Sequence, residues 1–186
     1  ISIGNNEEKL TYKLNVDALK SESFALNKIS LSGDIADNII NYTVNTKDAS
    51  DKDQFLIAGN LKSLGDITEI SLNPNGLMLN YGNWNVNPEN KIQLLNGGII
   101  ADNFDLTSNG AEIKLQSETQ SANSPLNVEI KNFRIRTLTE MIKKDSLLAD
   151  GTINGTAQLR NLTGEMTFDA DMNVSDLFVY GSPVGN

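Results

Sequence analysis

The sequence predicts an all-β domain with one short helix, built as an elongated antiparallel sheet with one apolar face. Three observations support this. Apolar and polar residues alternate along most of the chain, the breaks between alternating runs are rich in Asn, Gly, Asp and Ser, and aromatic residues make up only 6% of the 186 residues. A compact core between two layers would hold more large rings, whereas a long thin sheet needs fewer.

The alternation predicts the strands one by one. Successive side chains of a strand point to opposite faces, so each run has a dry face and a wet face. Almost no run is apolar on both faces, which argues against a buried parallel sheet. The apolar positions are Leu10, Tyr12, Leu14 and Val16; Ile29, Leu31 and Ile35; Ile40, Tyr42 and Val44; Phe55, Ile57 and Leu61; Leu77, Leu79 and Tyr81; Trp84 and Val86; Phe104 and Leu106; Ile113 and Leu115; Leu126, Val128 and Ile130; and Met166, Phe168, Ala170, Met172 and Val174.

Short turns are predicted where residues that tolerate left-handed backbone interrupt these runs. They are the segments 73–76, 96–98 and 108–110, and Asn109-Gly110 is the best hairpin signal among them. The segments 47–53 and 118–124 are expected to be longer solvated loops. Together these breaks predict roughly a dozen strands.

One segment has helical spacing. Thr137 and Glu140 fit a capping box, in which Thr137 caps the first turn and Glu140 reaches back to it. Apolar residues follow at intervals of three and four, and two lysines suit the C-terminal end of the helix dipole. The sequence therefore predicts a short helix over 138–144.

Composition argues against an enzyme. The chain has no His and no Cys, which removes the commonest general base and the usual zinc ligands. Its net charge is −9, so neither nucleic acid nor an anionic membrane surface is an expected partner. The closely spaced carboxylates at Asp51 and Asp53, and at Asp169 and Asp171, are interpreted as solvated charges. No catalytic residue, cofactor or metal is expected.

We interpret residues 1–186 as a single β-rich domain. The chain opens with Ile1 and not Met, and it contains no signal peptide or membrane-spanning segment. The expectation is that it is a fragment of a much longer chain.

The C-terminal third carries a succession of motifs. They are L-x-x-G-x-I-x-G over 148–155, Phe-Asp-Ala-Asp over 168–171 and Gly-x-Pro-Val-Gly over 181–185. This succession resembles the TamB-like proteins of the Bacteroidetes envelope, which belong to the AsmA-like superfamily. The best match covers 138–186. Over 1–124 the likeness depends on alternation alone.

The resemblance implies a β-taco, which is a half-pipe of sheet with an apolar concave face. It also implies a periplasmic location, in a parent chain anchored in the inner membrane of a Gram-negative bacterium. The expected function is a hydrophobic groove for phospholipid transport, outer-membrane protein assembly or both. The expected partners are phospholipid acyl chains or outer-membrane β-barrel clients, together with an outer-membrane assembly barrel. The family has no catalytic residues.

A groove of this kind would be lined by the inward-facing apolar residues. Each methylene that an acyl chain buries there contributes about 0.8 kcal/mol. The alternative is that the same residues form an ordinary core between two sheets. The predicted lining residues are Leu77, Leu79, Phe104, Leu106, Ile113, Leu115, Val128, Ile130, Met166, Phe168, Met172 and Val174.

Two other functions remain open from the sequence. One is a β-sandwich binding module or adhesin-like domain of a secreted bacterial protein, in which the apolar stripes meet face to face. The other is an enzyme with a carboxylate mechanism, for which no convincing pair stands out. A groove should retain detergent or fatty acid during purification, whereas a sandwich should not.

Overall fold

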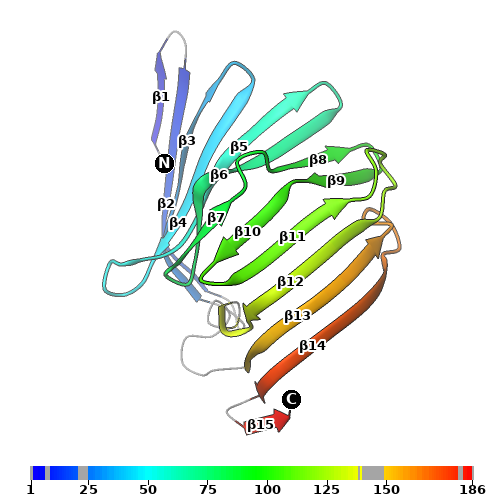
Figure 1. Ribbon diagram of the computed structural model, residues 1–186. Helices are drawn as coiled ribbons and strands as arrows, with labels where there is room; N and C mark the ends of the chain where they lie inside the picture. The colour runs from blue at the N-terminus through cyan, green and yellow to red at the C-terminus, as the bar shows by residue number, and fades with distance from the viewer. Residues whose placement is uncertain are drawn as a thin grey trace.

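The computed structural model describes residues 2–6, 9–20, 25–137, 139, 149–179 and 182–185. Within these residues the strands form one antiparallel sheet of fifteen strands that is not closed (Figure 1). The expectation of an all-β fold is therefore confirmed. The strands are β1 (Ser2–Asn6), β2 (Lys9–Lys20), β3 (Ala25–Ala36), β4 (Ile39–Lys47), β5 (Asp53–Leu64), β6 (Ile67–Leu79), β7 (Gly82–Val86), β8 (Lys91–Leu95), β9 (Gly98–Asp102), β10 (Phe104–Ser108), β11 (Ala111–Ser117), β12 (Leu126–Arg134), β13 (Ala149–Arg160), β14 (Thr167–Val179) and β15 (Ser182–Gly185).

Strands that follow each other in the chain are mostly neighbours in the sheet. The order runs from β1 to β7 and continues from β10 to β15, while the β8–β9 hairpin lies off this path. The strand β6 serves both branches, because its second half pairs with β7 and its first half pairs with β8. A single sheet with a fork differs from the two facing sheets of the sandwich alternative.

Asn90 fills the gap at this fork. It lies in the break between β7 and β8, and only 3% of it is exposed. Its Nδ2 donates to the carbonyl oxygen of Leu72 at 2.8 Å, and its Oδ1 accepts from the Leu72 N–H at 2.8 Å. The amide thus replaces a missing strand residue, so the sheet divides without leaving these backbone groups unpaired.

The predicted turns are partly right. Asn109-Gly110 joins β10 to β11, with φ angles of 48° and 83°, as the hairpin signal indicated. The segment 96–97 joins β8 to β9, and the expected loops lie at 48–52 and 118–125.

The prediction of a turn at 73–76 was wrong, because this segment lies inside β6. There β6 advances five residues, from Leu72 to Leu77, while β5 advances only two, from Ile57 to Gly59. The Asn, Pro and Gly residues therefore form a bulge and not a chain reversal. Turns and β-bulges both favour residues that tolerate irregular backbone, so Asn, Pro and Gly suit either of them.

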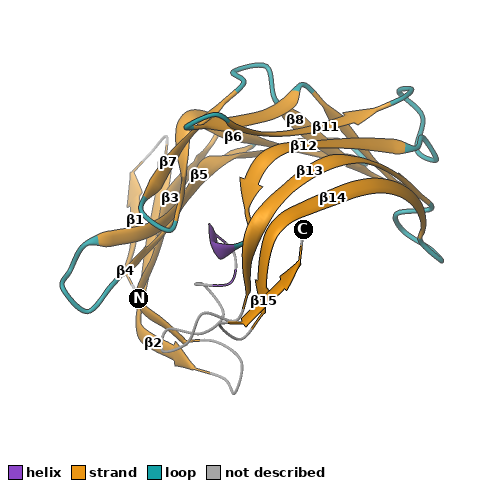
Figure 2. Cartoon of the chain, turned by 60° about the horizontal axis from the view of Figure 1, so that its bottom comes forward, coloured by secondary structure: helices purple, strands orange, loops and turns teal. Residues whose placement is uncertain are grey.

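Glycine permits a close approach in β13. Gly155 has a φ angle of 145°, and a Cβ at this position would lie 2.1 Å from the carbonyl oxygen of Asp171 on β14. No other residue can adopt this backbone at that distance without strain. Figure 2 shows β12, β13 and β14 bending along their length into an arch, and Gly155 lies within β13.

The predicted helix is described only at its beginning. Arg136, Thr137 and Thr139 are helical, and the Thr139 N–H donates to the carbonyl oxygen of Ile135 at 3.1 Å. In Figure 2 this turn lies beneath the arch. The remainder of the predicted helix, residues 138 and 140–144, lies outside the described residues.

Candidate functional site

Strand pairing places the apolar positions of the C-terminal half on one face. Residues that pair directly across antiparallel strands point to the same side of the sheet. One row of such pairs crosses the sheet from β7 to β14 with a single glycine in it. Its members are Val86, Leu106, Ile113, Ile130, Gly155 and Met172.

The N-terminal half continues the same face. A second row of pairs runs from β2 to β7 and reaches the first row through β7, where Trp84 and Val86 point to the same side. It consists of Leu14, Leu31, Val44, Ile57, Leu77 and Trp84. The apolar face is thus continuous from β2 to β14. We refer to this surface, which both rows define, as the apolar face.

The predicted lining residues fall into three groups. Leu77 and Leu106 are buried in the centre of the apolar face, while Phe168 and Met172 on β14 are exposed. Met166 precedes β14 and is also exposed, so it belongs to no paired row. The half-buried members are Leu79, Phe104, Ile113, Leu115, Val128, Ile130 and Val174.

The centre of the apolar face is closed by its own side chains. The rings of Trp84 on β7 and Phe133 on β12 lie with their centroids 5.9 Å apart. These strands are three positions apart in the sheet, which is about 14 Å if the sheet is flat. The small side chain of Ala111 packs beneath this cluster. The buried residues of the cluster are Leu77, Trp84, Val86, Leu106 and Phe133.

The two flanks of the apolar face remain open. On the C-terminal flank, Phe168 is 64% exposed and Met172 is 39% exposed. On the N-terminal flank, Leu10, Ile35 and Ile57 are each exposed by more than one third. Large apolar side chains are therefore exposed to solvent on both flanks of the apolar face.

Sequence reasoning missed Phe133. A bulge lies between Ile130 and Phe133, where Asn132 has a φ angle of 49°. In a regular strand, two residues that are three apart point to opposite faces. The extra residue of the bulge shifts the alternation by one, so Phe133 and Ile130 lie on the same face. Trp84 belongs to an alternating run but was not assigned to the lining. As the only Trp of the chain, on an alternating strand, it was interpreted as a core residue, and in the structure it is buried.

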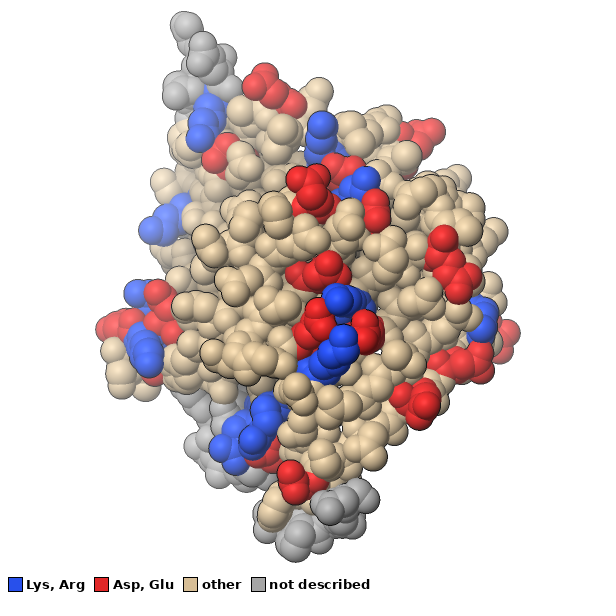
Figure 3. All heavy atoms as spheres, viewed as in Figure 1, with Lys and Arg blue, Asp and Glu red and all other residues tan. Residues whose placement is uncertain are grey.

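The opposite face of the sheet is polar. Glu112 accepts ion pairs from Lys114 at 2.8 Å and from Lys131 at 3.0 Å. Hydrogen bonds from these two lysines hold the pKa of Glu112 below its ordinary value. Figure 3 shows such opposite charges interspersed over β11 and β12. Because these side chains are solvated, they contribute little to stability and keep this face wet.

Asp150 is the most buried carboxylate among the described residues. Its side chain is 8% exposed and accepts from Arg134 at 2.7 Å and from Arg136 at 3.1 Å. Burial by itself raises the pKa of Asp150. Hydrogen bonds from Arg134 and from the Gly151 N–H, together with the positive charges of Arg134 and Arg136, outweigh burial and lower the pKa below its ordinary value. This cluster ties the end of β12 to the start of β13.

Three of the four carboxylates considered in the sequence, Asp51, Asp53 and Asp169, pair with basic side chains. Asp51 lies 2.5 Å from Lys28, and Asp169 lies 2.5 Å from Arg160. Both are more than two thirds exposed. These contacts support the interpretation of solvated charges.

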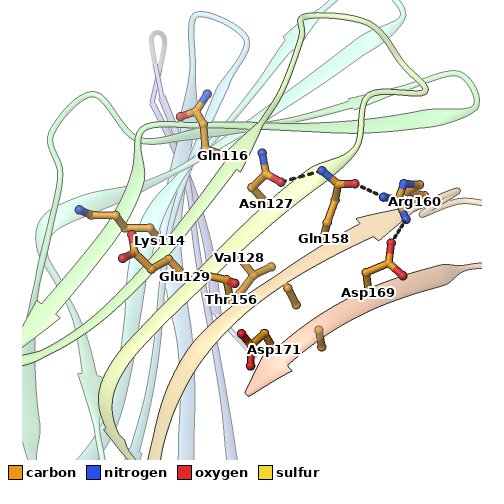
Figure 4. Close-up of a pocket in the computed structure, with 12 residues that line it drawn as sticks. Lys114, Gln116, Asn127, Val128, Glu129, Thr156, Gln158, Arg160, Asp169 and Asp171 are labelled. Carbon is orange, nitrogen blue, oxygen red and sulfur yellow. Dashed lines mark hydrogen bonds and ion pairs between the residues drawn. The ribbon is translucent and has the colours of Figure 1, made fainter. Parts of the chain in front are cut away.

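A hollow of about 660 Å³ lies over β11 to β14 (Figure 4). It is bordered by polar side chains and therefore belongs to the polar face. Of the predicted lining residues only Val128 contributes to it. The apolar face itself is an open surface on its flanks.

Comparison with protein families, with curated proteins and with solved structures finds no match to this chain. In the described part of the chain, no helix has the length and apolar character needed to cross a membrane.

Proposed function

We propose that this chain is a segment of an envelope protein whose apolar face forms a concave groove that binds the acyl chains of phospholipids. The proposal depends chiefly on one observation, which is a continuous apolar face from β2 to β14 with open flanks. A face of this kind gains free energy by covering apolar surface, at about 25 cal/mol for each Å² removed from water.

The contact between Trp84 and Phe133 supports a sheet that bends toward the apolar face. Both rings project from that face, and their strands would be about 14 Å apart in a flat sheet. Bending toward the rings brings them together, whereas bending away would separate them. The arch in Figure 2 is consistent with a half-pipe.

An acyl chain suits the apolar face better than a polypeptide does. The N–H and C=O groups of the central strands are engaged with neighbouring strands. A polypeptide lying on the face would therefore bury its own backbone groups without partners, at a cost of about 1 to 3 kcal/mol for each group. An acyl chain has no such groups, so contact with the face is favourable along its whole length.

The resemblance of 138–186 to TamB-like proteins extends this proposal. On that basis the groove would lie in the periplasm of a Gram-negative bacterium, within a longer chain anchored in the inner membrane. Phospholipid would move along the groove between membranes, and an outer-membrane assembly barrel would be a partner. Neighbouring apolar residues on the open flanks favour such movement, because each step replaces one apolar contact by another.

A fatty acid whose fluorescence rises in apolar surroundings, cis-parinaric acid, tests the proposal. We expect saturable binding to the chain and about tenfold weaker binding to the Met172→Asp variant, because a charge then lies on the open flank. Asn173→Asp is the matched control, since it adds the same charge to the other face of the same strand. Absence of binding, or equal weakening by both substitutions, would contradict the proposal.

A further inference from the structure

The hollow on the polar face has the form of a narrow groove with two walls (Figure 4). Each wall is a row of directly paired residues that crosses β11, β12, β13 and β14. Since the rows are two residues apart along each strand, the walls are separated by about 7 Å, and they extend over about 14 Å. One wall consists of Lys114, Glu129, Thr156 and Asp171, and the other of Gln116, Asn127, Gln158 and Asp169.

The floor of the groove is formed by the residues between the walls. Val128, Ala157 and Ala170 line it, and their side chains belong to the opposite face. Only their main-chain and Cα atoms therefore lie between the two rows. The groove can accept a slender ligand in contact with this floor.

Hydrogen bonds hold one wall in place before any ligand arrives. The Nε2 of Gln158 donates to Asn127 Oδ1 at 3.1 Å and to Glu118 Oε1 at 2.5 Å. Arg160 donates to Asp169 at 2.5 Å and also to Gln158 Oε1. These bonds restrain the side chains of this wall, which reduces the conformational entropy that they lose on binding.

Other polar groups of the groove have no partner within the described part of the chain. These are the Nδ2 of Asn127, the hydroxyl of Thr156 and the carboxylate of Asp171. The Asn127 nitrogen donates hydrogen bonds, the Thr156 hydroxyl can donate and accept them, and the Asp171 carboxylate accepts them. Because Asn127 lies on one wall and the other two lie on the opposite wall, a ligand in the groove can contact both.

The charges of the groove argue against an anionic ligand. Its cations are already paired, Lys114 with Glu112 at 2.8 Å and Arg160 with Asp169. Phosphate and other anions would therefore meet no unpaired cation among the described residues of the groove. The free amide nitrogen of Asn127, the hydroxyl of Thr156 and the carboxylate of Asp171 can form hydrogen bonds with the hydroxyl and acetamido groups of sugars.

We infer that this groove on the polar face binds a neutral oligosaccharide. The inference is independent of acyl-chain binding, because it concerns the other face of the sheet. Among the described residues no aromatic ring lines the groove, so sugar rings have nothing to stack on there and the dissociation constant should be about 1 mM. A long glycan with many equivalent sites would bind more tightly through multivalency.

Nuclear magnetic resonance can test this on the intact chain, with the tetramer of N-acetylglucosamine as the probe and with EDTA present to remove metal ions. We expect shifts of the side-chain amide signals of Asn127 and Gln158 and of the backbone signals of Ala157. Asn127→Ala and Gln158→Ala should each weaken binding at least fivefold. Gln93→Ala is the control, because it removes an amide at a distant site that bonds to Glu69.

Three results would overturn the inference. They are the absence of shifts at about ten times the expected dissociation constant, equal binding by the groove variants and the control, and the same shifts with an equal mass of polyethylene glycol. Unchanged spectra outside the groove will show that the variants remain folded.

Discussion

Two phenylalanines on the apolar face should respond very differently to truncation. Phe133 is 4% exposed and contacts Trp84, whereas Phe168 is 64% exposed on β14. Phe133→Ala and Phe168→Ala remove the same atoms from the same face. The pair therefore tests directly whether the face has a closed centre and an open flank.

The expected losses follow from these exposures. Phe133→Ala removes a buried ring and leaves a cavity, which costs about 3 to 5 kcal/mol of unfolding free energy. Phe168 has only about one third of its surface removed from water, so its truncation should cost about 1 kcal/mol or less. The difference between the variants should be at least about 2 kcal/mol.

Urea unfolding followed by circular dichroism measures both losses. Trp84 fluorescence is less suitable, because removal of Phe133 changes the surroundings of this ring. The dependence of the unfolding free energy on urea should be the same in both variants if each alters stability alone. Equal losses for the two substitutions would refute the description of Phe168 as an open flank, and a loss below about 1 kcal/mol for Phe133→Ala would refute the closed centre.

Three further substitutions test the fold. Asn90→Ala should lower the unfolding free energy by about 2 kcal/mol, because both backbone groups of Leu72 lose their partner, and urea unfolding measures this. Gly155→Ala should cost about 2 kcal/mol or more through backbone strain and a clash, whereas Gly164→Ala, with open space around it, should change stability by less than about 0.5 kcal/mol. Asp150→Asn should cost about 2 kcal/mol at pH 7. The pKa of Asp150 is lowered in the folded protein, so its contribution to the unfolding free energy is present above about pH 3.9 and is lost as the pH falls through the folded-state pKa. The unfolding free energies of the wild type and of Asp150→Asn should therefore converge in acid.

The alternating pattern was sufficient to predict much of the fold. Side-chain direction in a strand has a period of two, so positions such as Ile113 and Leu115 must share a face wherever the strand is regular. Hairpin signals such as Asn109-Gly110 then make successive strands neighbours. Together these local rules predict an antiparallel sheet with one apolar face, and the described strands confirm an all-β, antiparallel fold.

Irregular positions could not be predicted in the same way. A bulge at Asn132 reverses the expected direction of Phe133, and the alternation of apolar and polar residues does not locate this bulge. The role of Asn90 depends on Leu72, which is 18 residues away in the chain. Contacts of this kind depend on how the whole sheet assembles, so local pattern does not contain them.

The polar groove was also beyond sequence reasoning. Its walls combine side chains from four strands, and their alignment depends on register. Asp169 and Asp171 were interpreted only as solvated charges. In the structure they border a hollow with Asn127 and Thr156, which come from other strands.

Contact between an acyl chain and the apolar face can be measured most directly by fluorescence quenching. In a Trp84→Phe background, Phe168→Trp places the single indole on the apolar face, and Asp171→Trp places it on the polar face of the same strand. Brominated stearic acid quenches an indole only at short range. We expect saturable quenching of the indole at position 168 and none at position 171. Equal quenching at both positions, or none at position 168, would contradict it.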